Sequence, residues 1–102
     1  MSKSMWWVLL PALVLAGCGS IRMPPARYDH KYAGKLNVVE MPLADLQRLC
    51  MNGNAGLRGC AFRHSASFCQ VLLMQGMDRA TRAQALQHEI GHCNGWTAAH
   101  ES

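Results

Sequence analysis

The sequence predicts a small α+β domain in which one helix packs on a short antiparallel sheet or hairpin, stapled by disulfide bonds. Two patterns support this class. Short segments between residues 35 and 73 are rich in β-branched residues and partly alternate, whereas residues 79–93 are rich in Ala, Gln, Arg and Leu. Four cysteines from residue 50 onward support the predicted disulfide bonds. With 102 residues in all, the chain has room for one small domain at most.

The first predicted strand is Lys35–Met41, which reads Lys-Leu-Asn-Val-Val-Glu-Met. Pro42 is expected to open a helix that runs to Met51, because proline suits the first turn of a helix. The glycines and asparagines of residues 52–56 then end that helix and form a loop.

Two further strands are predicted at residues 59–63 and 67–73, joined as a hairpin by a turn at residues 64–66. The last element is a helix from Arg79 to about Cys93. Asp78 is a natural N-cap for this helix, and an Asn-Gly pair directly after it is a stop signal.

Residues 1–17 have the layout of an export signal. Lys3 gives a positive start, and the apolar run Trp6–Ala16 leads into small residues and a cysteine. The run is too short to span a bilayer as a mature helix. A buried core helix is the alternative, but the position behind a lysine at the N-terminus favours the signal.

The segment Leu15-Ala16-Gly17-Cys18 resembles the bacterial lipobox. The resemblance implies that the signal is cut before Cys18 and that Cys18 carries acyl chains, each buried methylene contributing roughly 0.8 kcal/mol to membrane binding. It therefore implies a location in the cell envelope. Because Gly19 follows the cysteine, where inner-membrane lipoproteins often carry Asp, the expected site is the outer membrane, facing the periplasm.

The remaining chain divides into residues 18–34, expected to be a lipidated tether, and a domain over residues 35–102. The tether holds Pro24-Pro25 and scattered polar residues with no apolar period, as a spacer would. Tyr28 and Tyr32 can still pack on the domain.

Removing the lipidated Cys18 from the count leaves Cys50, Cys60, Cys69 and Cys93, an even number that suggests two disulfides in an exported chain. Three pairings are possible. We favour Cys50–Cys60 with Cys69–Cys93, because the first closes a Gly/Asn-rich loop and the second ties a strand to the last helix. A cysteine zinc site is disfavoured because no Cys-x-x-Cys occurs.

The net charge of +4 falls by one, to +3, when Lys3 is removed with the signal. The basic residues form no cluster, so the charge could favour anionic lipid or cell-wall polymer but does not argue for nucleic acid, which needs a basic stripe or a known module.

The last predicted helix contains His88-Glu89-Ile90-Gly91-His92, the H-E-x-x-H pattern. Residues four apart share one helical face, so both imidazoles can reach one Zn²⁺ ion. Glu89 is the candidate catalytic residue, a general base for the zinc-bound water. The alternative is an ordinary helix with polar surface residues. Gly91 inside a helix costs about 1 kcal/mol, which a close approach by a neighbouring element would explain.

The continuation of the motif resembles the metzincin zinc peptidases, whose pattern is H-E-x-x-H-x-x-G-x-x-H. His88, Glu89, His92 and Gly95 match, but Ala98 stands where the third ligand is expected. No methionine follows to make the family's methionine turn.

A second likeness, to small bacterial proteins with H-E-x-G-H-x-N-G-W followed by a histidine, implies His100 as the third metal ligand. His64 ranks second, and Glu101 and Asp78 are further candidates. Trp96, after the glycine turn, either walls the metal pocket or covers the core.

The sequence thus predicts an envelope-anchored zinc hydrolase, in its narrower form a metallopeptidase acting on a peptide, a protein or peptidoglycan. An extended substrate is expected to lie beside the strand around residues 68–73. The alternative is a non-catalytic zinc-binding or metal-free envelope lipoprotein that acts through a protein partner.

Overall fold

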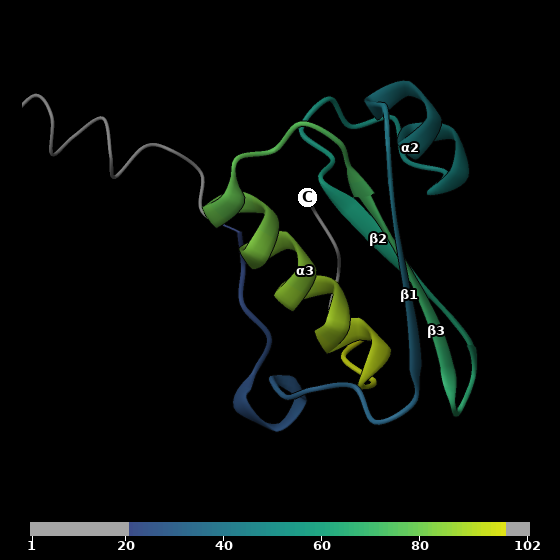
Figure 1. Ribbon diagram of the computed structural model, residues 1–102, viewed down its shortest axis with the longest axis vertical. Coiled ribbons are helices and arrows are strands. Elements are labelled where there is room, and N and C mark those ends of the chain that lie inside the picture. Colours follow the sequence, from purple (N-terminus) through teal and green to yellow (C-terminus); the bar gives the residue numbers. More distant parts are fainter. Residues whose placement is uncertain (1–20, 98–102) are drawn as a thin grey trace, which may run out of the picture.

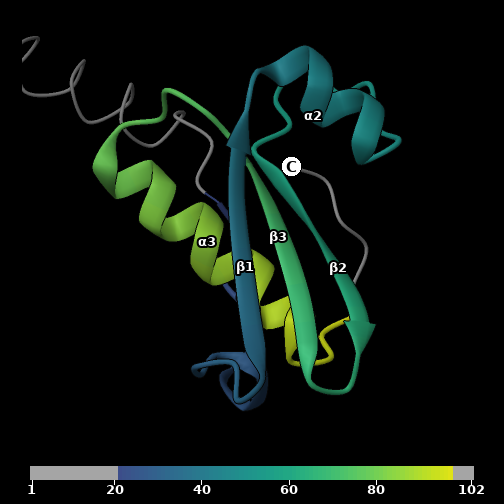
Figure 2. The same ribbon diagram turned by 45° about the vertical axis from the view of Figure 1, so that its right-hand side comes forward.

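The computed structural model describes residues 21–97 and has the predicted α+β architecture, with two helices on opposite faces of a three-stranded sheet (Figures 1 and 2). Along the chain the elements are a 3₁₀ turn η1 (Ala26–Tyr28), strand β1 (Lys35–Met41), helix α2 (Leu43–Leu49), strand β2 (Gly59–Ser65), strand β3 (Phe68–Met74) and helix α3 (Arg79–Cys93). The long helix α3 runs across one face of the sheet, and the short α2 covers one end of the other.

The sheet is mixed, with strand order β1-β3-β2. The predicted hairpin is confirmed, since β2 pairs with β3 in antiparallel. Strand β1 instead pairs with β3 in parallel, Lys35 opposite Phe68, so the sheet beyond the predicted hairpin is mixed and not antiparallel. A parallel neighbour requires a crossover connection, and α2 and β2 together supply it.

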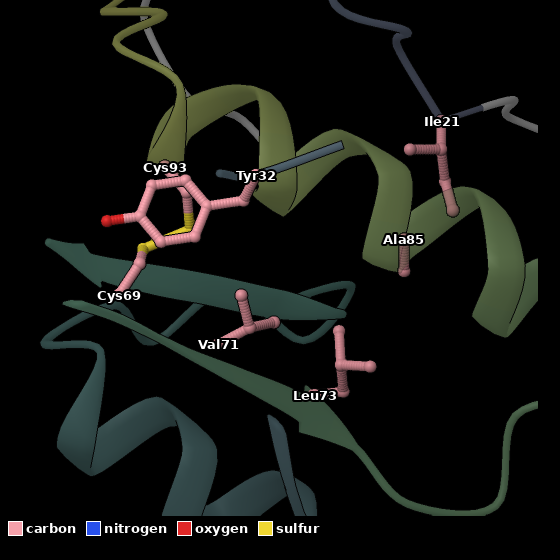
Figure 3. Packing of buried hydrophobic residues seen from close by; sticks show 7 residues of the cluster. All are labelled: Ile21, Tyr32, Cys69, Val71, Leu73, Ala85 and Cys93. Atoms are coloured by element: carbon pink, nitrogen blue, oxygen red, sulfur yellow. A yellow bond between two sulfur atoms is a disulfide. The ribbon is translucent and has the colours of Figure 1, made fainter. Parts of the chain in front are cut away.

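The core lies between α3 and the sheet. Alternate residues of β3 face the helix, so Val71 and Leu73 pack toward Ala85 (Figure 3). The buried members of this cluster are Ile21, Tyr32, Cys69, Val71, Leu73, Ala85 and Cys93. A second cluster, under α2, joins Leu46 to Leu57 and Leu72 on the opposite face. The period of two along a strand thus gives this small sheet two apolar faces.

Residues 21–34, where the sequence predicts a tether, pack along the domain. Ile21 is buried against the core cluster near Ala85, as Figure 3 shows. Tyr32 is buried as well, and its hydroxyl donates to the Ala66 carbonyl at 3.3 Å. This segment therefore contributes to the fold from its first described residue.

Both disulfides join the predicted cysteines, with S–S distances of 2.06 Å for Cys50–Cys60 and 2.08 Å for Cys69–Cys93. The first ties the end of α2 to β2. The second ties the last residue of α3 to the central strand (Figure 3). Within residues 21–97, no helix combines the length and the apolar character that a membrane span requires.

Candidate metal centre

Helix α3 carries the H-E-x-x-H motif and begins at a well-formed cap. Asp78 accepts from the Thr81 backbone amide at 3.1 Å and from its hydroxyl at 2.6 Å, which confirms the predicted N-cap. These hydrogen bonds, the one from the Thr81 hydroxyl above all, lower the pKa of the Asp78 carboxyl below its ordinary value. The cap fixes the residue at which the helix begins. It therefore also fixes which face of the helix the motif residues occupy in the last turns.

The end of α3 is held just as firmly. Gly95 has a φ of +110°, a conformation that favours glycine, and turns the chain so that the Trp96 amide donates to the Gly91 carbonyl at 3.0 Å. The Asn94 side-chain amide donates to the carbonyls of Tyr28 and His30, at 2.9 and 2.6 Å. The Asn-Gly pair thus ends the helix and attaches the loop around residue 29 to it.

His88, Glu89 and His92 converge at this end of the helix. One ligand atom from each residue lies within 4.8 Å of the others, so the group could hold a metal ion. The Nε2 atoms of His88 and His92 are 3.2 Å apart. His88 and Glu89 are buried, with exposed fractions of 4% and 1%. The predicted convergence of the two histidines on one helical face is therefore present.

A backbone carbonyl lies against the other nitrogen of each imidazole. His88 Nδ1 is 2.5 Å from the Arg22 carbonyl oxygen, and His92 Nδ1 is 2.7 Å from that of Trp96. Because a carbonyl only accepts, each Nδ1 must be the donor. In the neutral ring this places the proton on Nδ1 and makes Nε2 the atom able to bind a metal. Neither acceptor could be predicted from residue type, since every residue supplies a backbone carbonyl.

Trp96 both covers the core and forms a wall beside the metal-capable histidines, the two roles between which the sequence did not decide. It is buried, with 6% of its surface exposed. Its ring stacks on that of His92, with centroids 4.6 Å apart and planes 8° apart, and meets His88 edge-on at 4.9 Å. The indole thus covers the core and walls the histidine pair, and it limits the rotation of both imidazoles.

Gly91, between the two histidines, faces the N-terminal segment. A Cβ at this position would lie 2.5 Å from Pro24 Cγ and 3.2 Å from Trp96 Cε3. The close approach expected from a glycine inside this helix is therefore confirmed, and Pro24 is the residue that makes it.

Glu89 points toward strand β2. A Cβ at Gly59 would lie 3.4 Å from Glu89 Cγ, 2.9 Å from Leu73 Cδ2 and 2.7 Å from the Leu72 carbonyl oxygen. Gly59 is thus a supporting residue that the sequence analysis missed. The sequence did contain a sign of this role, since a glycine in a predicted strand often marks a close approach by another element.

A pocket of about 340 Å³ opens beside this carboxylate. Its lining residues are Cys50, Asn52, Leu57, Gly59, Cys60, Ala61, Phe62, Glu89, His92 and Thr97. Strand β2 forms one wall and is an edge strand, whereas β3 is the central strand. The expectation of a substrate beside residues 68–73 is therefore wrong, because β1 and β2 already occupy both edges of β3.

The other proposed ligands lie elsewhere. His64 is exposed on the sheet face that carries α2, 3.4 Å from Gln70 Oε1 and stacked with Phe68 at 5.2 Å. Asp78 caps the far end of α3. Neither belongs to the metal-capable group found among residues 21–97. His100, Glu101 and the lipidation candidate Cys18 fall outside the described residues.

Comparisons of the chain with protein-family models, with curated proteins and with solved structures find no match.

Proposed function

We propose that this protein is an envelope-anchored zinc hydrolase, in the narrower form a metallopeptidase, with Glu89 as its general base. One observation carries the proposal: two imidazole Nε2 atoms 3.2 Å apart beside a buried carboxylate that borders a pocket. An ordinary helix would leave such side chains in solvent. Burial of a carboxylate costs free energy unless the group is paired, hydrogen-bonded or next to a metal ion.

The spacing of the two nitrogens suits zinc. Imidazole nitrogens bind Zn²⁺ at 2.0–2.1 Å, and two of them at a tetrahedral angle are about 3.3–3.4 Å apart. The observed 3.2 Å is close to this span. The carbonyls on the two Nδ1 atoms are the kind of partner that fixes a metal-binding imidazole. The type of these donors and the distance between them therefore fit a zinc ion.

When bound, zinc would supply a Lewis acid that acidifies water and polarises a carbonyl group. The protein's own contribution is at Glu89. One oxygen of its carboxylate would accept a proton from water as that water attacks the carbonyl carbon. The same group would then return the proton to the leaving nitrogen when the carbon–nitrogen bond breaks. The burial of Glu89 beside the pocket keeps this carboxylate at the place where a substrate can enter.

A catalytic zinc usually has three protein ligands, and we assign the third to His100. Thr97 lines the same pocket as Glu89 and His92. His100 follows it by three residues, a reach of up to about 10–11 Å. Among residues 21–97, His64 lies on the opposite sheet face, and the metal-capable group contains no third histidine.

Two features support a substrate of peptide character in the envelope. The pocket wall formed by β2 belongs to an edge strand, which offers backbone groups to an extended chain. The sequence Leu-Ala-Gly-Cys18 supports attachment through lipid on the cysteine, and Gly19 after it supports the outer membrane, facing the periplasm. A protein or a peptidoglycan peptide would meet both conditions.

A non-catalytic zinc lipoprotein is the second candidate, and one observation favours it. A Glu89 oxygen belongs to the same 4.8 Å group as the two histidine nitrogens. Were it a ligand, the site would hold zinc with no base left to activate water. Replacing Glu89 by Gln separates the two cases, because a base is dispensable for zinc retention and a ligand is not.

The first experiment counts zinc per chain by mass spectrometry on the mature protein made in an oxidising compartment. We expect about one zinc per chain, lost in His92→Ala and in His100→Ala and kept in the control His64→Ala. Retention in His100→Ala would move the third ligand to another residue. A native chain without zinc would overturn both zinc readings and leave a metal-free lipoprotein that acts through a partner.

A further inference from the structure

We propose that residues 21–25, here called the strap, are a positioning element of the metal centre and set its affinity by fixing His88. The inference rests on the proposed function only in taking His88 as a metal ligand. It concerns a segment that contributes no ligand and that the sequence presents as a spacer.

The first observation is the contact between the strap and the imidazole. The Arg22 carbonyl oxygen accepts from His88 Nδ1 across a sequence separation of 66 residues. This is the acceptor that places the proton on Nδ1 and leaves Nε2 toward His92 Nε2. The corresponding acceptor for His92 is the Trp96 carbonyl, which lies in the turn after α3 itself. One histidine is therefore oriented locally, and the other by a segment from the opposite end of the chain.

The second observation is how the strap is attached. Ile21 is buried in the core at 8% exposure, close to Ala85 (Figure 3). Pro24 is buried on Gly91, which has no side chain to obstruct it. The side chains of Arg22 and Met23, between these two attachment points, are exposed. The strap is thus fixed at both ends while its central backbone faces His88.

The metal centre therefore depends on a residue without a Cβ at position 91. A side chain there would collide with Pro24 and lift the strap from the helix. The Arg22 carbonyl would move with it, and His88 would lose the partner that sets its tautomer. Loss of such a partner typically lowers metal affinity by 10- to 100-fold.

The test compares two variants of the mature chain that release opposite ends of the strap. Ile21→Asp places a charge in the core at one end, and Pro24→Gly removes the packing on Gly91 at the other. Met23→Ala is the matched control, since it shortens an exposed side chain in the same strap and keeps every backbone carbonyl. Competition of Zn²⁺ against a chromophoric chelator should show 10- to 100-fold weaker binding in the first two and less than a twofold change in the control.

A second readout isolates positioning from general loss of structure. ¹⁵N chemical shifts of the histidine rings in the metal-free protein at neutral pH report which nitrogen carries the proton. We expect Nδ1–H at His88 in the native chain, and a mixture of tautomers in Ile21→Asp and Pro24→Gly. His92 is the internal control, because its acceptor is the Trp96 carbonyl and should keep Nδ1–H throughout.

The outcomes are decisive in either direction. Unchanged zinc affinity and an unchanged His88 tautomer in Pro24→Gly overturn the proposal, even if Ile21→Asp fails to fold. A tautomer change at His92 as well would mean collapse of the whole site and would also count against it. If the native chain binds no zinc, the proposed function fails, but the tautomer of His88 still decides whether the strap positions the ring.

Discussion

Gly59 on β2 lies directly against Glu89 on α3, so close that a Cβ at residue 59 would come within 3.4 Å of Glu89 Cγ. The same Cβ would lie 2.7 Å from the Leu72 carbonyl oxygen, and backbone does not move aside as a flexible side chain can. The glycine thus sets the distance between the sheet and the helix at the place where the carboxylate enters the pocket.

Gly59→Ala should therefore destabilise the protein by about 1–3 kcal/mol, the usual cost of overpacking a filled site. Urea unfolding measures the free energy of unfolding. Gly53→Ala is the matched control, because a Cβ there has no atom within 4 Å and the residue does not have a positive φ. A loss of the same size in both variants would mean that crowding near Glu89 is not the cause.

Glu89→Gln should keep about one zinc per chain and lower the rate of hydrolysis by roughly 10²- to 10⁴-fold, the range for loss of a general base. The amide has the shape of the carboxylate but cannot take up the proton. A quenched-fluorescent peptide library supplies the assay. Glu40→Gln is the control, since that carboxylate is exposed on β1 and pairs with Arg82. Full activity in Glu89→Gln would contradict the assigned role, and loss of zinc would make Glu89 a ligand.

The two disulfides should have similar effects on stability and different effects on metal binding. Each closes a loop, of sequence separation 24 for Cys69–Cys93 and 10 for Cys50–Cys60. Replacing either pair by alanines should cost roughly 3 kcal/mol of folding free energy.

Only the removal of the Cys69–Cys93 bridge should also weaken zinc binding. Cys93 follows His92, and the bridge fixes the last turn of α3 to the central strand. Titration with zinc under native conditions checks this. Equal weakening in the variant without Cys50–Cys60 would argue that overall stability, not the placement of His92, controls the affinity.

Asp78 should make stability depend on acid pH. Its pKa is lowered in the folded chain, so the stabilisation is fully present above the ordinary carboxyl pKa and is lost as the pH falls through the lowered folded value. Asn is an equally good N-cap without a titrating group. Urea unfolding from about pH 5 to about pH 2 should therefore show a shallower loss of stability in Asp78→Asn.

Thr81→Ala provides the check on the cause of that shift. The Thr81 hydroxyl is the first-ranked cause of the lowered pKa of Asp78, and its removal should make the same pH dependence shallower. A native-like acid profile in Thr81→Ala would place the effect in the backbone amides that also donate to Asp78, or in another carboxylate.

The elements that the sequence predicted well are bounded by local signals. Strand Lys35–Met41 ends at a proline, and helix Arg79–Cys93 begins after an aspartate cap and ends at an Asn-Gly pair. The favoured disulfide pairing is also confirmed, because each bridge joins segments that the predicted elements already bring together. The H-E-x-x-H group could be found for the same reason, since a spacing of four residues on a helix fixes a shared face.

What the sequence could not predict depends on contacts between distant segments. The parallel pairing of β1 with β3 joins residues 33 positions apart, and no local pattern distinguishes a parallel neighbour from an antiparallel one. The acceptors for His88 and His92 are backbone carbonyls, which every residue type provides. The packing of residues 21–34 depends on single residues, Ile21 and Tyr32 among them, and these form no apolar period.

Under the proposed lipid anchor at Cys18, the burial of Ile21 would limit how far from the membrane the domain can lie. Ile21 follows Cys18 by three positions, and a fully extended chain of that length spans at most about 10–11 Å. The headgroup layer on one side of a bilayer is itself roughly 5–8 Å thick. A lipid on Cys18 would therefore hold the domain in contact with the headgroups, because the connecting chain is too short to let it move away from the membrane surface. Substrates would have to come to the bilayer surface, so such an enzyme would act on its immediate neighbours in the membrane layer.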